Sequence, residues 1–360
     1  MPAGTLVLYT DQPARRADLL RALEQIAPCT TLGAAEPPPS ATCIALVADL
    51  DLLVPAPLTG LRSLIASTPD LPRVFLMRSM GTRSLSAARG LGGRLCLPAE
   101  TPVGTVVEAL RAQIRPPAAP PKPTAPVAGS APGVPLVAQA ADRAGAVIAS
   151  LLESARASGT VDAALVNESL DPILGAIGVG GLTAWLETVR AYDDATYQHC
   201  LLVAGLAATF AIDLGFSATD RQLLVRAALV HDVGKAKIPL AILNKPGPLD
   251  PAERTVMCTH AALGHEILVK AGGFDETVLA VVRHHHEMLD GSGYPDGLKG
   301  DAIPDIVRLI TVCDVYAALV ERRPYRPPLP AAEAMRILHG MKGKLDGYLV
   351  RAFERSVAGT

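Results

Sequence analysis

Leu223-Leu224-Val225-Arg226-Ala227-Ala228-Leu229-Val230 is an apolar run with helical spacing, and it leads directly into His231-Asp232-Val233-Gly234-Lys235. Adjacent residues on a helix point about 100° apart, so His231 and Asp232 can reach two sides of one cavity. Lys235 follows His231 by four residues and Asp232 by three, which places it on the same helical face as both. An imidazole, a carboxylate and an ammonium grouped in this way indicate metal ligands with a cation beside a bound phosphate. The alternative is a buried, hydrogen-bonded pair of His231 and Asp232 with a structural role only.

Length and composition predict a multidomain protein. The 360 residues are enough for two or three domains, and aromatic residues make up only 4%, so we expect cores of Ala, Leu and Val. The formal net charge is −2 and the sequence has no basic block, which disfavours a polymeric nucleic acid as partner but not a small phosphorylated substrate. The sequence shows no signal-peptide pattern and no uncharged membrane span, so a cytoplasmic location is expected. The six cysteines lack CxxC spacing and lie in or beside apolar runs, which favours reduced, buried thiols over disulfides.

Residues 1–115 alternate short apolar runs with helical patterns, as a βα-repeating domain does. The runs that predict buried parallel strands are Thr5–Tyr9, Cys43–Ala48, Arg73–Met77 and Arg94–Leu97. Helices are predicted near 13–26, 60–67, 82–91 and 103–114. The N-terminal domain is therefore expected to be a doubly wound α/β domain.

Residues 116–135 consist mainly of Pro, Ala and Gly without periodicity, which predicts an extended linker. Helical spacing of apolar residues follows over 136–157, 160–176, 179–191, 194–214, 218–232, 251–270, 275–286, 304–320 and 331–340. We predict a helical connector over 136–191 and an all-α domain over 192–360.

The eight histidines all lie in the C-terminal half of the chain, at His199, His231, His260, His265, His284, His285, His286 and His339. Metal sites in helical bundles collect His and carboxylate side chains from several facing helices, which these positions allow. Asp314 is a lone carboxylate in the apolar run 309–315, so a metal or a His partner is expected for it. Taken singly, His265 and His339 are interpreted as ordinary helix residues and His284 as a bystander.

The order and size of the elements in residues 1–115 resemble a response-regulator receiver domain. Asp49 matches the phospho-acceptor position of that family, Asp11 lies near its Mg²⁺-binding acidic pair, and Ser79 matches its hydroxyl after the fourth strand. The family's Lys-Pro is Leu97-Pro98 here, and a second clear acid beside Asp11 is lacking. We therefore expect a degenerate receiver used for docking or dimerisation, with phosphorylation of Asp49 as the less favoured alternative.

Between Asp193 and Arg326 several motifs follow one another. They are His231–Lys235, Ile242–Gly247, His285–Pro295, Gly297–Gly300, Ile303-Pro304, Arg308, Asp314 and Arg323-Pro324-Tyr325-Arg326. This ordered series resembles the HD-GYP family, a branch of the HD metal-dependent phosphohydrolase superfamily. The resemblance implies a helical bundle that hydrolyses cyclic di-GMP to linear pGpG or GMP. Iron and manganese are the expected metals, with nickel and zinc as alternatives.

Carried over position by position, the resemblance implies the metal ligands His199, His231, Asp232, His260, His285, His286 and Asp314. Asp232 is expected to bridge two metals. Some members bind a third metal through a Glu at the position of Ala195, so two divalent transition metals are expected here. Asp193 is expected to support the substrate or the ligands. Ala317 stands where many members have an Asp, which removes an expected hydrogen bond to the ligands.

The expected reaction is attack on phosphorus by a hydroxide that bridges the two metals, while Lys235 stabilises the developing charge. Arg323 and Arg326 resemble family residues that hold the distal phosphate or a guanine, and the forked guanidinium suits both contacts.

Three further side chains lie in or beside the segment 285–295. Tyr294 follows two glycines in Gly291-Ser292-Gly293, and it is expected to stack on a guanine or to dock a partner; a plain turn is the alternative. Glu287 and Asp290 are expected to support the ligands through hydrogen bonds.

Three functions remain open at this stage. The first is hydrolysis of cyclic di-GMP. The second is a catalytically weak cyclic di-GMP sensor or scaffold that binds GGDEF-type partners, which Ala317 and the degenerate receiver favour. The third is hydrolysis of another cyclic dinucleotide or nucleotide, which Gly293-Tyr294-Pro295 disfavours. A homodimer interface over 136–191 is a further prediction.

Overall fold

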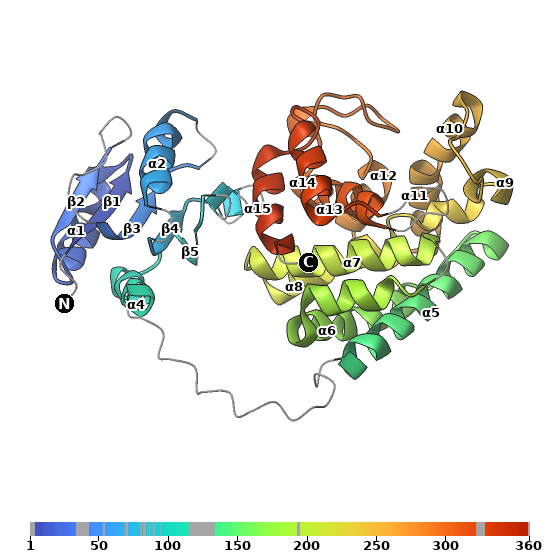
Figure 1. Cartoon of the computed structure of the whole chain (residues 1–360), viewed down its shortest axis with the longest axis horizontal. Helices are drawn as coiled ribbons and strands as arrows, with labels where there is room; N and C mark the ends of the chain where they lie inside the picture. Colours follow the sequence, from blue (N-terminus) through green and yellow to red (C-terminus); the bar gives the residue numbers. More distant parts are fainter. Residues whose placement is uncertain are drawn as a thin grey trace. The chain divides into compact units, whose positions relative to one another are not determined.

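The computed structural model describes residues 4–33, 43–52, 55–68, 71–79, 81, 84–85, 87–88, 91–93, 95–114, 134–192, 195–321 and 328–358. The chain divides into two compact units, Met1–Ala128 and Gly129–Thr360 (Figure 1). The predicted linker over 116–135 falls almost entirely outside the described residues.

A five-stranded parallel sheet forms the centre of the first unit. Its strands are β1 (Thr5–Thr10), β2 (Cys29–Leu32), β3 (Cys43–Asp49), β4 (Arg73–Met77) and β5 (Leu95–Pro98). They lie in the order β2-β1-β3-β4-β5, and all neighbours pair in parallel. This order is common among doubly wound α/β domains.

Both faces of the sheet are buried, as the continuous apolar runs of its strands predict. Leu8 of β1 belongs to a core that includes residues of α1 (Ala17–Glu24) and α4 (Val103–Ile114). Val7 and Tyr9 point to the opposite face, because side chains alternate along a strand, and they are buried as well. The predicted parallel α/β sheet is therefore confirmed.

The prediction differs from the structure at three places in this unit. Strand β2 was not predicted, because Cys29-Thr30-Thr31-Leu32 is a short edge strand with one buried residue. The helix predicted over 13–26 is a 3₁₀ turn, η1 (Pro13–Arg16), followed by α1. Helix α2 (Pro55–Ser67) begins earlier than predicted. The helix predicted over 82–91 lies partly outside the described residues.

The described part of the second unit is all-α, as predicted. Its helices are α5 (Val134–Ser158), α6 (Ala163–Val189), α7 (Ala195–Asp213), α8 (Ala218–Val230), α9 (Leu240–Leu243), α10 (Pro251–Cys258), α11 (His260–Ala271), α12 (Glu276–His284), α13 (Asp305–Val320), α14 (Ala331–Gly340) and α15 (Gly347–Val357). Two 3₁₀ helices, η2 (Val233–Lys237) and η3 (Gly300–Ala302), connect them.

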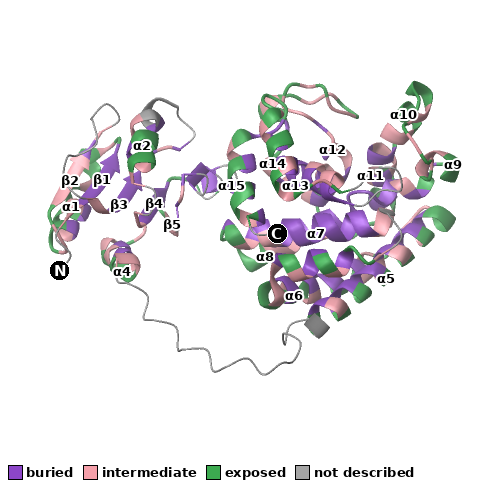
Figure 2. Cartoon of the chain, viewed as in Figure 1, coloured by how far each residue is buried: buried purple, intermediate pink, exposed green. Residues whose placement is uncertain are grey.

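Helix α7 is the central helix of this unit. It packs against α6 and α8 and against α13 and α15, so it is buried along most of its length (purple in Figure 2). Trp185 of α6 is fully buried, and its indole N–H donates a hydrogen bond of 2.9 Å to the carbonyl oxygen of Leu201. Gly205 allows this approach, because a Cβ there would lie 2.3 Å from the indole ring. The contact fixes α7, which carries His199, against α6.

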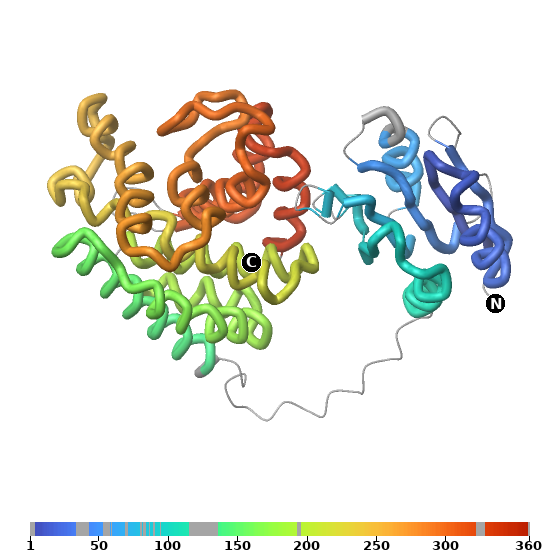
Figure 3. The backbone as a smooth tube through the Cα atoms, turned by 180° about the vertical axis from the view of Figure 1, so that it is seen from behind, coloured from blue at the N-terminus to red at the C-terminus, as the bar shows by residue number. Residues whose placement is uncertain are grey.

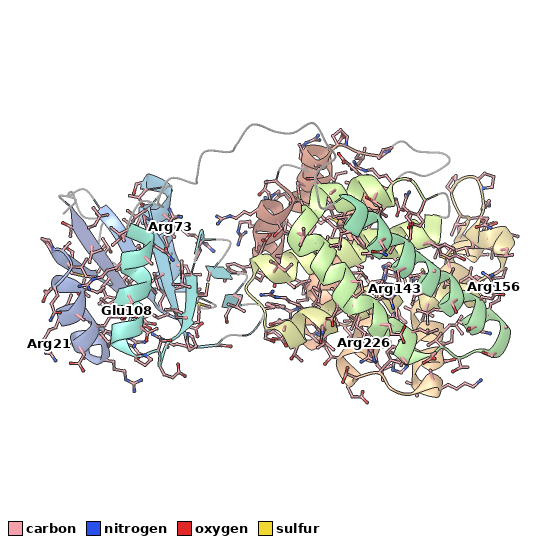
Figure 4. The ribbon with its side chains drawn as sticks, turned by 90° about the horizontal axis from the view of Figure 1, so that it is seen from below. Arg21, Arg73, Glu108, Arg143, Arg156 and Arg226 are labelled. Carbon is pink, nitrogen blue, oxygen red and sulfur yellow. The ribbon has the colours of Figure 1, made fainter. Side chains whose placement is uncertain are left out.

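Helices α5 and α6 lie along one side of the unit (Figure 3), and Arg143 and Arg156 extend from α5 (Figure 4). The C-terminal end of α5 is tied to the elements that follow in the chain. Lys237 of η2 donates to the carbonyl oxygen of Arg156 at 3.1 Å, and Lys270 of α11 donates to that of Ser158 at 3.2 Å.

The predicted helix boundaries need four corrections in this unit. The two helices predicted over 160–176 and 179–191 form one element, α6, with a kink at Gly181, whose φ of 74° is not helical. The helix predicted over 251–270 is broken at Thr259 into α10 and α11. Helix α9 was not predicted, because its four residues are too few to show a helical pattern of apolar residues. Helix α15 was also missed, although Asp346 caps its first turn.

Helix α6 is long and apolar enough to cross a membrane by length and composition. This is weak evidence for a membrane span, because the core helix of a soluble protein can have the same length and apolar composition. Residues of α6 such as Ile173 and Leu186 are buried inside the unit, where α6 packs against α5 and α7.

Candidate metal centre

Five helices or their ends bring together the seven side chains that the sequence suggested as ligands. His199 comes from α7, His231 follows the last residue of α8, and Asp232 precedes η2. His260 begins α11, His285 and His286 follow the end of α12, and Asp314 lies in the middle of α13. They form two groups, His199 with His231 and Asp314, and Asp232 with His260, His285 and His286. Within each group the candidate ligand atoms lie within 4.8 Å of one another, and all but His286 are buried.

The two carboxylates connect the two groups. Asp232 Oδ2 lies 3.3 Å from His231 Nε2, while its Oδ1 lies 3.2 Å from His260 Nε2. Asp314 Oδ1 lies 2.9 Å from His199 Nε2, while its Oδ2 lies 3.5 Å from His286 Nδ1. Each carboxylate thus presents one oxygen to each group, which is the arrangement that two adjacent cations can share.

The tautomers of three histidines are fixed by the backbone. Nδ1 of His231 lies 2.7 Å from the Ala228 carbonyl oxygen, and Nδ1 of His260 lies 2.8 Å from that of Met257. Nδ1 of His285 lies 3.0 Å from the Val282 carbonyl oxygen. A carbonyl only accepts, so each Nδ1 carries the proton and each Nε2 offers a lone pair to the centre.

These lone pairs need a cation between them. The Nε2 atoms of His260 and His285 face each other at 3.3 Å, and both are acceptors in the tautomers just described. Asp232 Oδ1, buried beside them, has no hydrogen-bond partner among the described residues. An unsatisfied buried carboxylate oxygen beside two imidazole lone pairs is unfavourable in a folded core, and a divalent metal removes that cost. The residues therefore fit a metal site.

Burial and charge shift the pKa values of three candidate ligands, His285, His286 and Asp232, toward the protonation states that bind metals. Burial and the neighbouring imidazoles lower the pKa of His285 well below its ordinary value, and burial lowers that of His286 to about 3. Burial alone would raise the pKa of Asp232, but Lys235 and His231 lower it well below its usual range. Neutral imidazoles and ionised carboxylates are the protonation states that bind metals.

Lys235 lies at the edge of this centre. Its ammonium contacts Asp232 Oδ2 at 2.5 Å, and its side chain is 21% exposed, so it contacts the carboxylate while part of the side chain remains accessible to solvent. The local structure differs from the expected continuous helix. Helix α8 ends at Val230 and η2 begins at Val233, so Lys235 approaches Asp232 across a 3₁₀ turn.

Gly234 allows α11 to approach this turn closely. A Cβ at position 234 would lie 1.9 Å from the carbonyl oxygen of His260 and 2.5 Å from the amide nitrogen of Gly264. The backbone of η2 is therefore in direct contact with the first turn of α11, and this contact brings His260 next to Asp232.

Glu287 is buried and organises the loop that follows the ligands. Its carboxylate accepts hydrogen bonds from the backbone N–H groups of Asp296, Gly297 and Leu298, at 2.7 to 3.0 Å. The loop folds back over the end of α12, and the ring of Tyr294 lies 4.7 Å from that of His286. Tyr294 therefore reaches the edge of the centre.

Other candidate residues lie away from the centre. Asp290 is exposed, and its Oδ1 accepts a hydrogen bond from the Ser292 N–H, so it shapes the turn and makes no contact with the described ligands. His284 Nε2 lies 2.9 Å from Asp296, outside both groups. Asp193, Arg323 and Arg326 lie outside the described residues.

Sequence analysis missed one buried acid, Glu321. Its Oε2 lies 2.8 Å from His199 Nδ1, while Nε2 of the same ring faces Asp314. Burial alone would lower the pKa of His199, but Glu321 and Asp314 outweigh it and raise that pKa to about 10. The available signal was its spacing of seven residues from Asp314, although Glu321 follows the end of α13 and is not part of the helix.

In the first unit, arginines occupy the candidate phosphorylation site. Arg16 binds both oxygens of Asp49, with Nε to Oδ2 at 2.7 Å and Nη2 to Oδ1 at 2.9 Å. Thr10 also donates to Asp49, at 3.1 Å. Arg78 forms an ion pair with Asp11. Ser79 is exposed, and its Oγ accepts from the Gly81 N–H.

The cysteines agree with the prediction of reduced thiols. All six are free of disulfides. Cys200 and Cys313 are buried as predicted, whereas the other four are only partly buried.

Comparison with known proteins identifies the region that contains this centre. A family model of the HD domain matches residues 185–349. The cyclic di-GMP phosphodiesterase PA4108 of Pseudomonas aeruginosa is 35% identical over 217 residues, 60% of this chain and 52% of that protein. The response regulator RpfG of Xanthomonas campestris, also named a cyclic di-GMP phosphodiesterase, is 38% identical over 46% of this chain and 40% of its own length. The 3'3'-cGAMP-specific phosphodiesterase 3 of Vibrio cholerae is 42% identical over 44% of this chain and 34% of its own length.

The chain thus spans about half the length, or less, of these curated relatives. Among solved structures, the HDG"Y"P protein Bd1817 of Bdellovibrio bacteriovorus matches this chain with a TM-score of 0.50 and 22% sequence identity. The match covers 61% of this chain and 72% of that protein, so the two share the fold. Residues 185–349 of this chain, which contain the candidate metal centre, are therefore similar to the HD domain.

Proposed function

We propose that this chain is a metal-dependent phosphodiesterase that hydrolyses cyclic di-GMP to linear pGpG or GMP. The observation that carries the proposal is the pair of carboxylates, Asp232 and Asp314, each of which offers one oxygen to each of two histidine groups. Two adjacent divalent metals supply Lewis acidity to a phosphate and an activated water to attack it. Relatives named as cyclic di-GMP phosphodiesterases support the choice of substrate.

The protein side chains divide between the two metals. His199, His231 and Asp314 would hold one metal, and His260, His285 and His286 would hold the other, with Asp232 available to both. Ala195 offers no ligand atom, which supports two metals rather than three. Imidazole and carboxylate ligands suit iron and manganese, and nickel or zinc are the alternatives.

Other residues act on the substrate. Lys235 carries its positive charge beside the carboxylate that joins the two groups, so a phosphate bound there receives charge stabilisation from its ammonium. Tyr294 lies against His286 and supplies an aromatic face for a guanine. Arg323, Arg326 and Asp193 keep their sequence-based assignment as substrate contacts.

A second substrate is supported by the comparisons. One relative that matches this chain at 42% identity is named as specific for 3'3'-cGAMP. Cyclic di-GMP and 3'3'-cGAMP both contain two 3'–5' phosphodiester bonds and at least one guanine. A metal centre that acts on the phosphate does not distinguish them, so selectivity between the two substrates depends on contacts with the bases. Hydrolysis of 3'3'-cGAMP is therefore the alternative activity, and a catalytically weak sensor or scaffold that binds GGDEF-type partners is the alternative from another class.

For the first unit we propose a degenerate receiver that serves as a docking or dimerisation module. The strand order β2-β1-β3-β4-β5 and the position of Asp49 at the end of β3 support the receiver assignment. The guanidinium of Arg16 binds both oxygens of Asp49, which supports loss of the phosphorylation reaction.

The test is hydrolysis by protein purified anaerobically and loaded with Mn²⁺ or Fe²⁺, with cyclic di-GMP and 3'3'-cGAMP compared by chromatography of the products. His231→Ala is expected to abolish turnover. His339→Ala is the matched control, because His339 pairs with Glu354 and lies outside both groups. Loaded protein that hydrolyses neither substrate would contradict the proposal and favour the sensor.

A further inference from the structure

Glu321 is a buried acid that neither the motif series nor the proposed ligand set includes. It is 4% exposed and follows the last residue of α13. We propose that Glu321 is a positioning residue, which orients His199 toward the metals and replaces the carboxylate that position 317 lacks. This inference rests on the proposed metal centre.

The geometry of His199 carries the first step. Its Nδ1 lies 2.8 Å from Glu321 Oε2, and its Nε2 lies 2.9 Å from Asp314 Oδ1 and 3.3 Å from His231 Nε2. Nδ1–H donates to Glu321, which leaves Nε2 as the ring atom that points into the centre. A carboxylate that accepts from the far nitrogen of a ligand histidine fixes its tautomer and ring orientation and makes it a stronger ligand. The three other buried histidines have backbone carbonyls at this place.

The placement of Glu321 favours a neighbour that donates a hydrogen bond or carries positive charge. A buried carboxylate loses its hydration, and the C-terminal end of a helix carries partial negative charge, which repels an acid. Among the buried acids of the second unit, Glu287 and Asp346 accept backbone N–H groups, which compensate for their burial. The carboxylate of Glu321 instead contacts the His199 ring, with Oε2 2.8 Å from Nδ1.

The helix positions explain the replacement. Asp314 and Ala317 lie on one face of α13, and Glu321, the residue after its end, continues their three- and four-residue spacing. Ala317 is fully buried between the two acids and supplies no hydrogen-bonding side chain to His199. Side chains on a helix point back toward its N-terminus, and the longer Glu side chain reaches over the preceding turn to the ring. The hydrogen bond lost through Ala317 is thereby supplied from one turn further along.

A structural role alone makes a different prediction. If Glu321 only stabilised the fold, its removal would affect metal binding whether or not His199 is present. If it acts through His199, its effect on metal affinity disappears once His199 is removed.

The experiment measures Mn²⁺ affinity of the full chain for wild type, Glu321→Gln, Glu321→Ala, His199→Ala and the double variant. Glu333→Ala is the control, because Glu333 lies on α14 and pairs with Arg336. Glu321→Ala is expected to weaken the affinity by roughly 10- to 100-fold, Glu321→Gln to weaken it less, and Glu333→Ala to leave it unchanged. Adding Glu321→Ala to His199→Ala should cause no further loss.

Glu321→Ala with wild-type affinity, or equal losses with and without His199, would overturn the inference. Hydrolysis of cyclic di-GMP by the wild type is followed in parallel. If the wild type binds Mn²⁺ normally but does not hydrolyse cyclic di-GMP, the proposed function is contradicted while the role of Glu321 stands. Failure of the proposed function and failure of the inference about Glu321 therefore give different results.

Discussion

Replacing Gly234 with Ala is expected to displace His260 from the metal centre. The Cβ of Ala would lie 1.9 Å from the carbonyl oxygen of His260 and 2.5 Å from the amide nitrogen of Gly264. Both neighbours are backbone atoms, so no side-chain rotation relieves the clash. Real Cβ atoms essentially never approach closer than 3.0 Å, so the gap between η2 and α11 must widen by about 1.1 Å.

A shift of this size is large for metal coordination, where ligand distances are held to within about 0.2 Å. His260 Nε2 now lies 3.2 Å from Asp232 Oδ1, and the two are expected to share one metal. The displacement should therefore release the metal of the His260 group. Overpacking of this kind also lowers the free energy of unfolding by about 1–3 kcal/mol, which corresponds to a melting temperature lower by roughly 2–12 °C.

The assay is metal analysis after anaerobic reconstitution, together with thermal melting of the metal-free and loaded protein. Gly175→Ala is the control. Gly175 is an exposed helical residue of α6 with no atom within 4 Å of the added Cβ, so the variant should be as stable as the wild type or up to about 1 kcal/mol more stable. A Gly234→Ala protein with wild-type metal content and melting temperature would refute the close backbone contact.

Four further predictions follow from the same structure. Lys235→Ala should retain its metals and lose on the order of 100-fold in kcat, measured by metal analysis and steady-state kinetics; an unchanged kcat would contradict the role of its charge. Removal of metals by EDTA should lower the melting temperature reversibly, because metal binds only the folded centre, whereas equal melting curves would argue against a resident metal. Glu287→Gln should lower the free energy of unfolding in urea by about 1–3 kcal/mol. The carboxylate accepts three N–H groups at its two oxygens, whereas the amide of Gln has only one oxygen. A change below about 0.3 kcal/mol would contradict this prediction. Acetyl phosphate should leave Asp49 unmodified in mass spectra because Arg16 binds both its oxygens, and a phosphorylated Asp49 would show that this ion pair opens.

Much of the candidate centre could be predicted from sequence because its ligands are unusual residues in apolar helices. His231-Asp232 and Asp314 stand out against their neighbours, and the structure places them together with the expected histidines. Glu321 could not be predicted from its own neighbourhood. It follows a helix as an ordinary polar residue, and only the packing of α13 against α7 brings it to His199.

The fold was predictable where periodicity was strong. Strands such as β4 and helices such as α14 have the predicted limits. Edge strand β2 has too few buried residues to show a pattern, and the break between α10 and α11 occurs without Pro or Gly. The role of Gly234 was also hidden, because a glycine required by the approach of another backbone looks like any other glycine in sequence.

The central claim is that Asp232 joins two metals in one centre. The most direct test is the manganese stoichiometry and electron paramagnetic resonance spectrum of the anaerobically reconstituted wild type beside Asp232→Ala. The structure predicts about two Mn²⁺ per wild-type chain with a magnetically coupled signal, and loss of the coupled pair in the variant. One isolated Mn²⁺ in the wild type, or an intact coupled pair without Asp232, would contradict the account.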